Sequence, residues 1–117
     1  MPRTRTSPDA PAPVADAQPS DLVDGIDELA AAIRTLRTTD EVTRFLRDLC
    51  TLAELEALTH RWQAARLLDE GLPYHEVAAR TGASTTTVTR VAQWLKRGAD
   101  GYRLVLDRRK RTSGRTA

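Results

Sequence analysis

A cluster of hydroxyl side chains between residues 84 and 89 is the group in this chain best suited to binding chemistry. Four hydroxyl residues follow one another from Ser84 to Thr87, and Thr89 comes two positions later. Threonine offers a hydroxyl for a phosphate or a base edge, and a methyl for the thymine methyl. The start of a helix needs one such residue as its N-cap, and Ser84 supplies it. The surplus of hydroxyls indicates a surface that contacts DNA.

The residues around this cluster have the spacing of a helix-turn-helix. Gly82 lies where the turn needs a left-handed backbone angle, which is costly for any residue with a Cβ. Ala78 is small enough to let two helices cross closely, and three valines take the buried positions on either side of the turn: Val77, Val88 and Val91. In such a unit the second helix enters the major groove while the first crosses the DNA backbone. We expect a helix-turn-helix at about residues 73–96, with helices near 73–80 and 84–96.

The second of these helices has one buried and one outward face. A helical wheel puts Val88, Val91, Ala92 and Leu95 on the buried face, and Thr86, Arg90 and Gln93 opposite. The predicted DNA-binding residues are Ser84, Thr85, Thr86, Thr87, Thr89, Arg90, Arg80 and Lys96. Residues 85–87 lie nearest the start of the helix and are the candidates for base edges. Because threonine makes no bidentate base contact, readout through water or DNA shape is expected.

The rest of the chain predicts an all-α domain over residues 21–107. Helical periodicity predicts helices at 21–37, from 38 or 39 to 49, at 51–70, and at 99–107. Thr38 with Glu41, and Thr51 with Glu54, have the spacing of a capping box. Five prolines in residues 1–20 predict a disordered arm, and residues 108–117 read as a basic disordered tail.

The net charge of +2 hides an asymmetry between the two halves of the chain. Residues 21–72 hold eleven acidic and six basic side chains, whereas residues 73–111 hold three acidic and nine basic ones. The basic half contains the predicted helix-turn-helix, as neutralisation of DNA phosphates would favour. The run at 108–111 either adds phosphate attraction or is simply solvated, and the sequence leaves both open.

Several other classes of function find no support. Cys50 is the only cysteine, so an intramolecular disulfide is impossible and a reducing, cytoplasmic setting is expected. No apolar run is long enough to span a membrane, and the N-terminus lacks the apolar core of a signal peptide. Cys50, His60 and His75 match no metal motif. We expect no catalytic residue, no metal and no cofactor.

At this point the residues resemble a known family. The run from Leu49 to Lys96, which contains LCTLAELEAL, LLDEGL and TGASTTTVTR, resembles the Trp repressor. TGASTTTVTRV together with GADGYRLVLDR is similar to the Trp-repressor-like YerC/YecD branch, and the resemblance covers residues 25–108. It implies a multi-helix, intertwined homodimer that presents two helix-turn-helix heads to double-stranded DNA, with a pseudo-palindromic operator.

The resemblance also carries Thr51, Arg61 and Arg90 onto the effector pocket of the Trp repressor. Two neighbouring positions depart from the family pattern. The glycine at the pocket floor is Val91 here, which would intrude on an indole, and a serine near the ligand amine is Trp94, which could fill the cavity or lie in the core or a dimer interface. Thr51 also has a sufficient role as an N-cap, and Arg61 can pair with Glu54 or Glu56. We therefore expect that tryptophan is not the ligand, and whether another small molecule binds stays open.

Together these patterns predict a sequence-specific transcriptional regulator, a repressor, that binds a palindromic operator as a homodimer. The alternative is a helix-turn-helix dimer that acts as a non-specific DNA-binding or protein-interaction module. Substitution of Thr86 or Thr87 separates the two, because only a reader of bases should lose its preference for one sequence.

Overall fold

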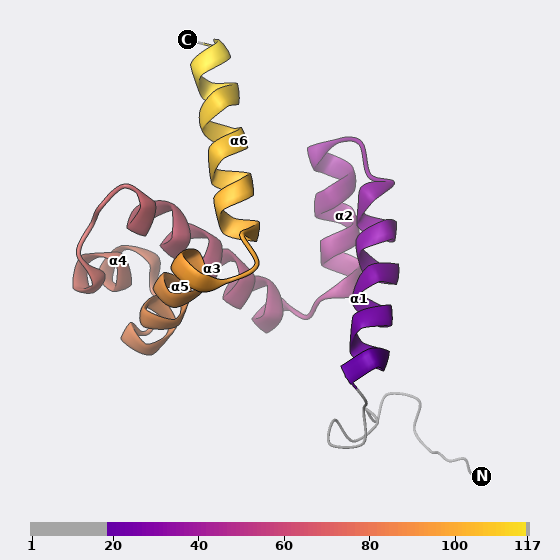
Figure 1. Cartoon of the computed structure of the whole chain (residues 1–117), viewed down its shortest axis with the longest axis horizontal. Coiled ribbons are helices and arrows are strands. Elements are labelled where there is room, and N and C mark those ends of the chain that lie inside the picture. Colours follow the sequence, from indigo (N-terminus) through magenta and orange to yellow (C-terminus); the bar gives the residue numbers. More distant parts are fainter. Residues whose placement is uncertain (1–18, 117) are drawn as a thin grey trace. The chain divides into compact units, whose positions relative to one another are not determined.

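The computed structural model describes the backbone of residues 19–116 and the side chains of residues 21–111, and these residues form helices joined by short connections (Figure 1). The elements are α1 (Pro19–Arg34), α2 (Thr39–Leu49), α3 (Leu52–Asp69), α4 (Tyr74–Thr81), α5 (Thr85–Arg97) and α6 (Gly101–Thr116). No strand occurs among the described residues, so the predicted all-α class is confirmed. Of the predicted N-terminal arm, residues 1–18 lie outside the described part, and Pro19 and Ser20 already belong to α1.

The described part of the chain divides into two compact units between Phe45 and Leu46, whereas the sequence predicted a single domain over 21–107. The division follows from where the apolar side chains lie. None of the described residues of α1 or α2 is buried, and Leu22 and Ile26 of α1 remain 64% and 54% exposed. α1 also ends at Arg34, three residues before the predicted end. The buried core therefore belongs to the second unit.

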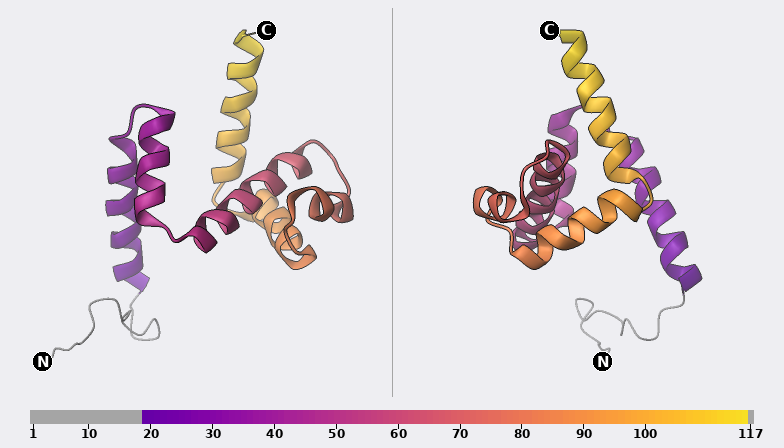
Figure 2. Two further views of the ribbon diagram at one scale, coloured as in Figure 1. Left: turned by 180° about the vertical axis from the view of Figure 1, so that it is seen from behind. Right: turned by 60° about the vertical axis from the view of Figure 1, so that its left-hand side comes forward.

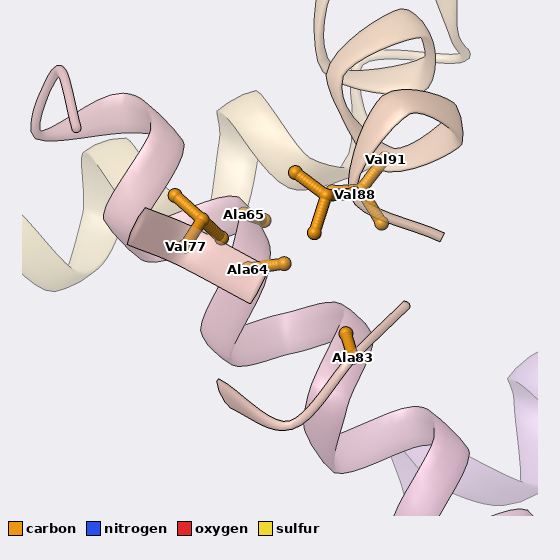
Figure 3. Close-up of a cluster of buried hydrophobic side chains, with 6 residues drawn as sticks. All are labelled: Ala64, Ala65, Val77, Ala83, Val88 and Val91. Atoms are coloured by element: carbon orange, nitrogen blue, oxygen red, sulfur yellow. The ribbon is translucent and has the colours of Figure 1, made fainter. Parts of the chain in front are cut away.

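That core lies where α4 and α5 pack across α3. Ala64 and Ala65 of α3, Val77 of α4 and Val88 of α5 are fully buried, and Val91 is 1% exposed. Figure 3 shows the side chains of Val77 and Val88 directed toward the two alanines. On the predicted buried face of α5, Val88, Val91 and Ala92 are buried and Leu95 is half-buried. Helical periodicity alone predicts an apolar stripe on α3 of Leu55, Leu58, Trp62, Ala65 and Leu68, and this is only partly right. The fully buried Ala64 lies outside the stripe, and Leu58 is 39% exposed.

The turn between α4 and α5 depends on two residues. Gly82 adopts a left-handed conformation with φ of 81°, as the sequence predicted. Thr81, which the sequence reasoning overlooked, is 7% exposed. Its hydroxyl donates to the carbonyl of Val77 at 2.8 Å and accepts from the backbone N–H of Ala83 at 3.1 Å. This pair of bonds satisfies polar groups that would otherwise be buried without partners.

Both predicted capping residues accept the expected hydrogen bonds. Thr51 caps α3 in a complete capping box with Glu54. Hydrogen bonds from the backbone and side chain of Thr51 lower the pKa of the Glu54 carboxyl. Thr38 accepts from the N–H of Glu41 at 3.1 Å. The Glu41 carboxylate accepts from the N–H of Arg37 instead of closing the box on Thr38.

The last helix is longer than predicted. α6 continues through residues 108–116, which the sequence predicted as a disordered tail, so the predicted helix end at Asp107 is wrong. Long-range contacts hold the helix to α3 as far as Lys110. Asp69, at the end of α3, accepts from Arg103 at 2.9 Å and from Lys110 at 2.6 Å, and Arg109 lies over the ring of Trp62 at 5.9 Å from its centroid.

Gly82→Ala should destabilise the fold by about 1–2 kcal/mol, because alanine pays the left-handed backbone penalty. A Cβ at this position would lie 3.6 Å from His60 Nε2, which is ordinary contact distance, so steric collision adds little. Urea denaturation at a fixed protein concentration measures the change. Gly82→Asn should cost less, since asparagine tolerates this conformation. Recovery of stability in Gly82→Ala/His60→Ala would show that a collision, not the backbone, was the cause.

Asp69→Asn should destabilise the fold by about 1–2 kcal/mol at pH 7, because it removes the charge that holds α6 to α3. The hydrogen bonds from Arg103 and Lys110 lower the pKa of Asp69 from 3.8 to about 2. A lowered folded-state pKa contributes stability that is present above pH 3.8 and is lost as the pH falls toward 2. The difference between the two proteins should therefore shrink across that range in urea titrations.

Asp107→Asn is the matched control for this prediction. Asp107 also accepts from Arg103, at 3.0 Å, but its side chain is 53% exposed. Its loss should cost less than about 0.5 kcal/mol at pH 7. Equal losses for Asp69→Asn and Asp107→Asn would contradict the role given to the link between α3 and α6.

Candidate nucleic-acid interface

The start of α5 carries an exposed row of hydroxyl side chains. Ser84, Thr85, Thr86 and Thr89 are exposed, and Thr87 is half-buried. α5 begins directly after the α4–α5 turn, so these residues lie beside that turn (Figure 1). The structure thus brings the five predicted hydroxyl residues together on one surface.

Hydrogen bonds within α5 already employ three of the five hydroxyls. Ser84 accepts from the N–H of Thr87 at 3.1 Å as the N-cap, and its hydroxyl donates to the Thr87 hydroxyl at 3.1 Å. The Thr89 hydroxyl donates to the carbonyl of Thr85 at 2.9 Å. Within the described residues, the hydroxyls of Thr85 and Thr86 make no hydrogen bond. The hydroxyls of these two side chains are therefore available to donate and accept hydrogen bonds with another molecule.

The N-terminus of α5 also presents a positive field. A helix carries roughly half a positive charge at this end, and backbone N–H groups of its first turn lack intrahelical partners. The first turn of α5 holds no acidic side chain that would offset this field. A phosphate is a suitable ligand for such an end.

The predicted basic contacts differ in how freely they could reach a phosphate. Arg80 is exposed but donates to Glu76 of its own helix at 2.6 Å. Arg90 and Lys96 are exposed on α5, and neither has an ion pair within the part of the chain that the structure describes. Arg90 and Lys96 are therefore better placed to bind a phosphate, whereas Arg80 must first break its ion pair with Glu76.

The predicted effector residues do not meet within one chain. Arg61 lines a hollow of about 270 Å³ between α3 and the start of α5, together with Glu56, His60, Ser84 and Thr87. Thr51 caps α3 outside this hollow, and Arg90 does not line it either. The predicted pairing of Arg61 with Glu54 or Glu56 is also absent from the described residues. Of the polar residues that line the hollow beside Arg61, the sequence pointed to Glu56 but not to His60, Ser84 or Thr87.

Val91 and Trp94, the two departures from the family pattern, differ in how far they are buried. Val91 belongs to the buried core at 1% exposure. Trp94 is 63% exposed and does not line the hollow beside Arg61. Trp94 therefore neither fills that cavity nor joins the core of the single chain, contrary to two of the roles considered for it.

Other kinds of site are not apparent in the described residues. No group of three or more His, Cys, Asp or Glu side chains there is arranged to hold a metal ion. No helix in the same part of the chain is long and apolar enough to cross a membrane.

Comparison with known proteins agrees with this geometry. Residues 24–110 match the model of the Trp repressor protein family. The YerC protein of Bacillus subtilis strain 168, whose function is uncharacterised, is 44% identical over 87 residues, which is 74% of this chain and 84% of YerC.

Two crystal structures are similar to most of this chain. A Staphylococcus aureus protein described as a Trp repressor matches with a TM-score of 0.72 and 35% identity, over 80% of this chain and 96% of that one. A TrpR-like protein from Eubacterium eligens matches with a TM-score of 0.68 and 39% identity, over 73% and 88%. From its sequence, its helix-turn-helix and these matches, the chain belongs to the Trp repressor family, whose members are DNA-binding regulators with a helix-turn-helix.

Proposed function

We propose that this protein is a homodimeric, cytoplasmic transcriptional repressor that binds a palindromic operator with the first turns of α5. The observation that carries the proposal is the row of exposed hydroxyls at the N-terminus of α5, held by the Gly82 turn and the Ser84 cap. Thr85, Thr86 and Thr87 would face base edges, Ser84 and Thr89 would complete the hydroxyl surface, and Arg90, Lys96 and Arg80 would neutralise phosphates.

The dimer is supported by apolar surface that a single chain leaves uncovered. Leu22, Ile26, Leu29 and Ile33 form one stripe of α1 and are between 39% and 64% exposed. Contiguous exposed apolar surface of this kind is typical of protein interfaces. Two heads related by a two-fold axis would read half-sites about 34 Å apart, one turn of DNA.

We further propose that DNA binding does not require tryptophan. Val91 is part of the core that joins α5 to α3, and its side chain takes the volume where the family resemblance puts a glycine. Any small molecule in the hollow beside Arg61 would instead meet the polar groups of Glu56, His60 and Thr87.

Selection of bound fragments from random duplex DNA at about physiological salt, with and without L-tryptophan, tests the function directly. A palindromic sequence enriched equally in both samples supports the proposal. Enrichment only with tryptophan contradicts the proposed independence from that ligand. Absence of any enriched sequence in both samples favours the non-specific or protein-interaction module.

Thr86→Ala and Thr87→Ala should each weaken binding to the selected operator by about 1–3 kcal/mol, while binding to a scrambled duplex changes little. Thr86→Ala is the cleaner variant, because the Thr86 hydroxyl makes no hydrogen bond within the described residues. Fluorescence anisotropy on both duplexes measures the change. Thr59→Ala, an exposed threonine on α3, is the matched control and should leave both affinities as they are.

Lys96→Ala tests the other class of contact. Loss of one phosphate contact should weaken binding to the operator and to the scrambled duplex alike, and should reduce the slope of log K against log salt by about 1 for each contact. If Thr86→Ala instead behaves as Lys96→Ala does, base reading by the hydroxyl row is wrong.

A further inference from the structure

One polar side chain lies within the buried core. Thr81 is 7% exposed, and among the residues whose burial the structure describes it is the one polar residue that is buried. A buried hydroxyl adds little net stability, because its hydrogen bonds replace bonds that it makes to water in the unfolded chain. A fully satisfied buried hydroxyl instead favours one arrangement of the chain, since a shift leaves a buried partner unpaired. The partners of Thr81 therefore show which arrangement it selects.

The two hydrogen bonds of Thr81 join the end of α4 to the far side of the turn. Its hydroxyl donates its only hydrogen to the carbonyl of Val77, one helical turn earlier, at 2.8 Å. The oxygen keeps its acceptor capacity and accepts from the N–H of Ala83 at 3.1 Å. The chain between Thr81 and Ala83 passes through Gly82, whose φ is 81°. The first bond thus fixes the hydroxyl, and the second fixes the residue that follows the left-handed glycine.

Ala83 passes this constraint to the start of α5. It is 8% exposed and its side chain belongs to the buried cluster of Figure 3, so water is poorly placed to replace the Thr81 hydroxyl. The next residue, Ser84, caps α5 by accepting from the N–H of Thr87 at 3.1 Å. In the views of Figure 2, α4 and α5 meet at this turn and both lie beside α3. A shift of the backbone at Ala83 would therefore move the cap and the first turn of α5.

We propose that Thr81 is a positioning residue for DNA reading, whose hydroxyl sets the direction in which the first turn of α5 presents residues 85–87 to base edges. The proposal rests on the sequence-specific function proposed above and assigns the residue that aligns its reading surface. A binding surface has to be held within roughly 0.5 Å and 10–20° of its productive geometry by buried supporting groups. Phosphate contacts from long side chains such as Arg90 and Lys96 tolerate small displacements. Thr81 therefore governs the preference among sequences more than the affinity for duplex DNA in general.

Thr81→Val tests the hydroxyl, because valine keeps the shape of threonine and removes both hydrogen bonds. The ratio of the affinity for the selected operator to the affinity for a scrambled duplex should fall by about tenfold, while the affinity for the scrambled duplex changes by less than about twofold. Thr81→Ser keeps the hydroxyl and should hold the ratio within about twofold of the wild-type value. Fluorescence anisotropy gives both affinities, at a temperature at which circular dichroism shows each variant to be folded.

Asp69→Asn is the control for a general loss of stability. Asp69 accepts from Arg103 and Lys110 of α6, and its substitution is expected to destabilise the fold without touching the turn. It should keep the wild-type ratio of the two affinities. A wild-type ratio in Thr81→Val would overturn the positioning role. An equal fall in the ratio in Asp69→Asn or in Thr81→Ser would also overturn it, because lost stability or the Thr81 methyl would then be the cause.

Hydrogen exchange of the DNA-free protein, followed by NMR, tests the positioning independently of the proposed function. In Thr81→Val the N–H of Thr87 should exchange at least about tenfold faster than in the wild type, after correction by the N–H of the fully buried Ala65 for any change in global stability. Faster exchange at Ala83 alone would make the bond a local one and overturn the positioning. If Thr87 responds but the wild-type protein prefers no sequence, the proposed function fails and takes the reading role with it, while the hold of Thr81 on α5 stands.

Discussion

The close approach of α4 and α5 to α3 is the contact on which the rest of the described fold depends. Ala64 and Ala65 have no side chain beyond Cβ and are fully buried, so Val77 and Val88 reach the surface of α3 directly. A larger residue at either alanine would push the two helices outward, since close-packed cores tolerate extra volume poorly. The direction of α5, and with it the position of the hydroxyl row, follows from this small contact area. The core has few large side chains, which is why caps and turn residues matter so much to it.

Sequence patterns predicted the parts of the structure that local chemistry determines. Ser84 and Thr51 cap helices because the hydroxyl of each accepts from a backbone N–H of the first turn that has no partner within the helix. Gly82 occupies the left-handed turn because a residue with a Cβ is strained at that backbone angle. The two faces of α5 follow from a period of 3.6 residues, and the structure has them as predicted. Each of these features needs information from only a few consecutive residues.

The features that were missed depend on contacts distant in sequence. The end of α6 could not be predicted at Thr116, because the acidic partner of Lys110 is Asp69, forty-one residues earlier. Ala64 was passed over because periodicity favours large apolar residues, whereas the crossing helices require a small one. Leu22, Ile26, Leu29 and Ile33 of α1 follow a helical period, but a pattern cannot say whether the surface that covers them belongs to the same chain. Thr51, Arg61 and Arg90 were joined by resemblance to a family, and one chain does not bring them together.

In the structure, several basic side chains of the basic half are already engaged by other side chains, which a count of charges does not show. Asp69 holds Arg103 and Lys110, Glu76 holds Arg80, and Arg109 covers an indole ring. On α5 itself the basic residues are Arg90, Lys96 and Arg97, and no ion pair involves them in the described part of the chain. Phosphate contacts by these cations release counterions and so attract DNA of any sequence. Preference for one sequence has to come from groups that depend on fit, namely hydroxyls that reach base edges.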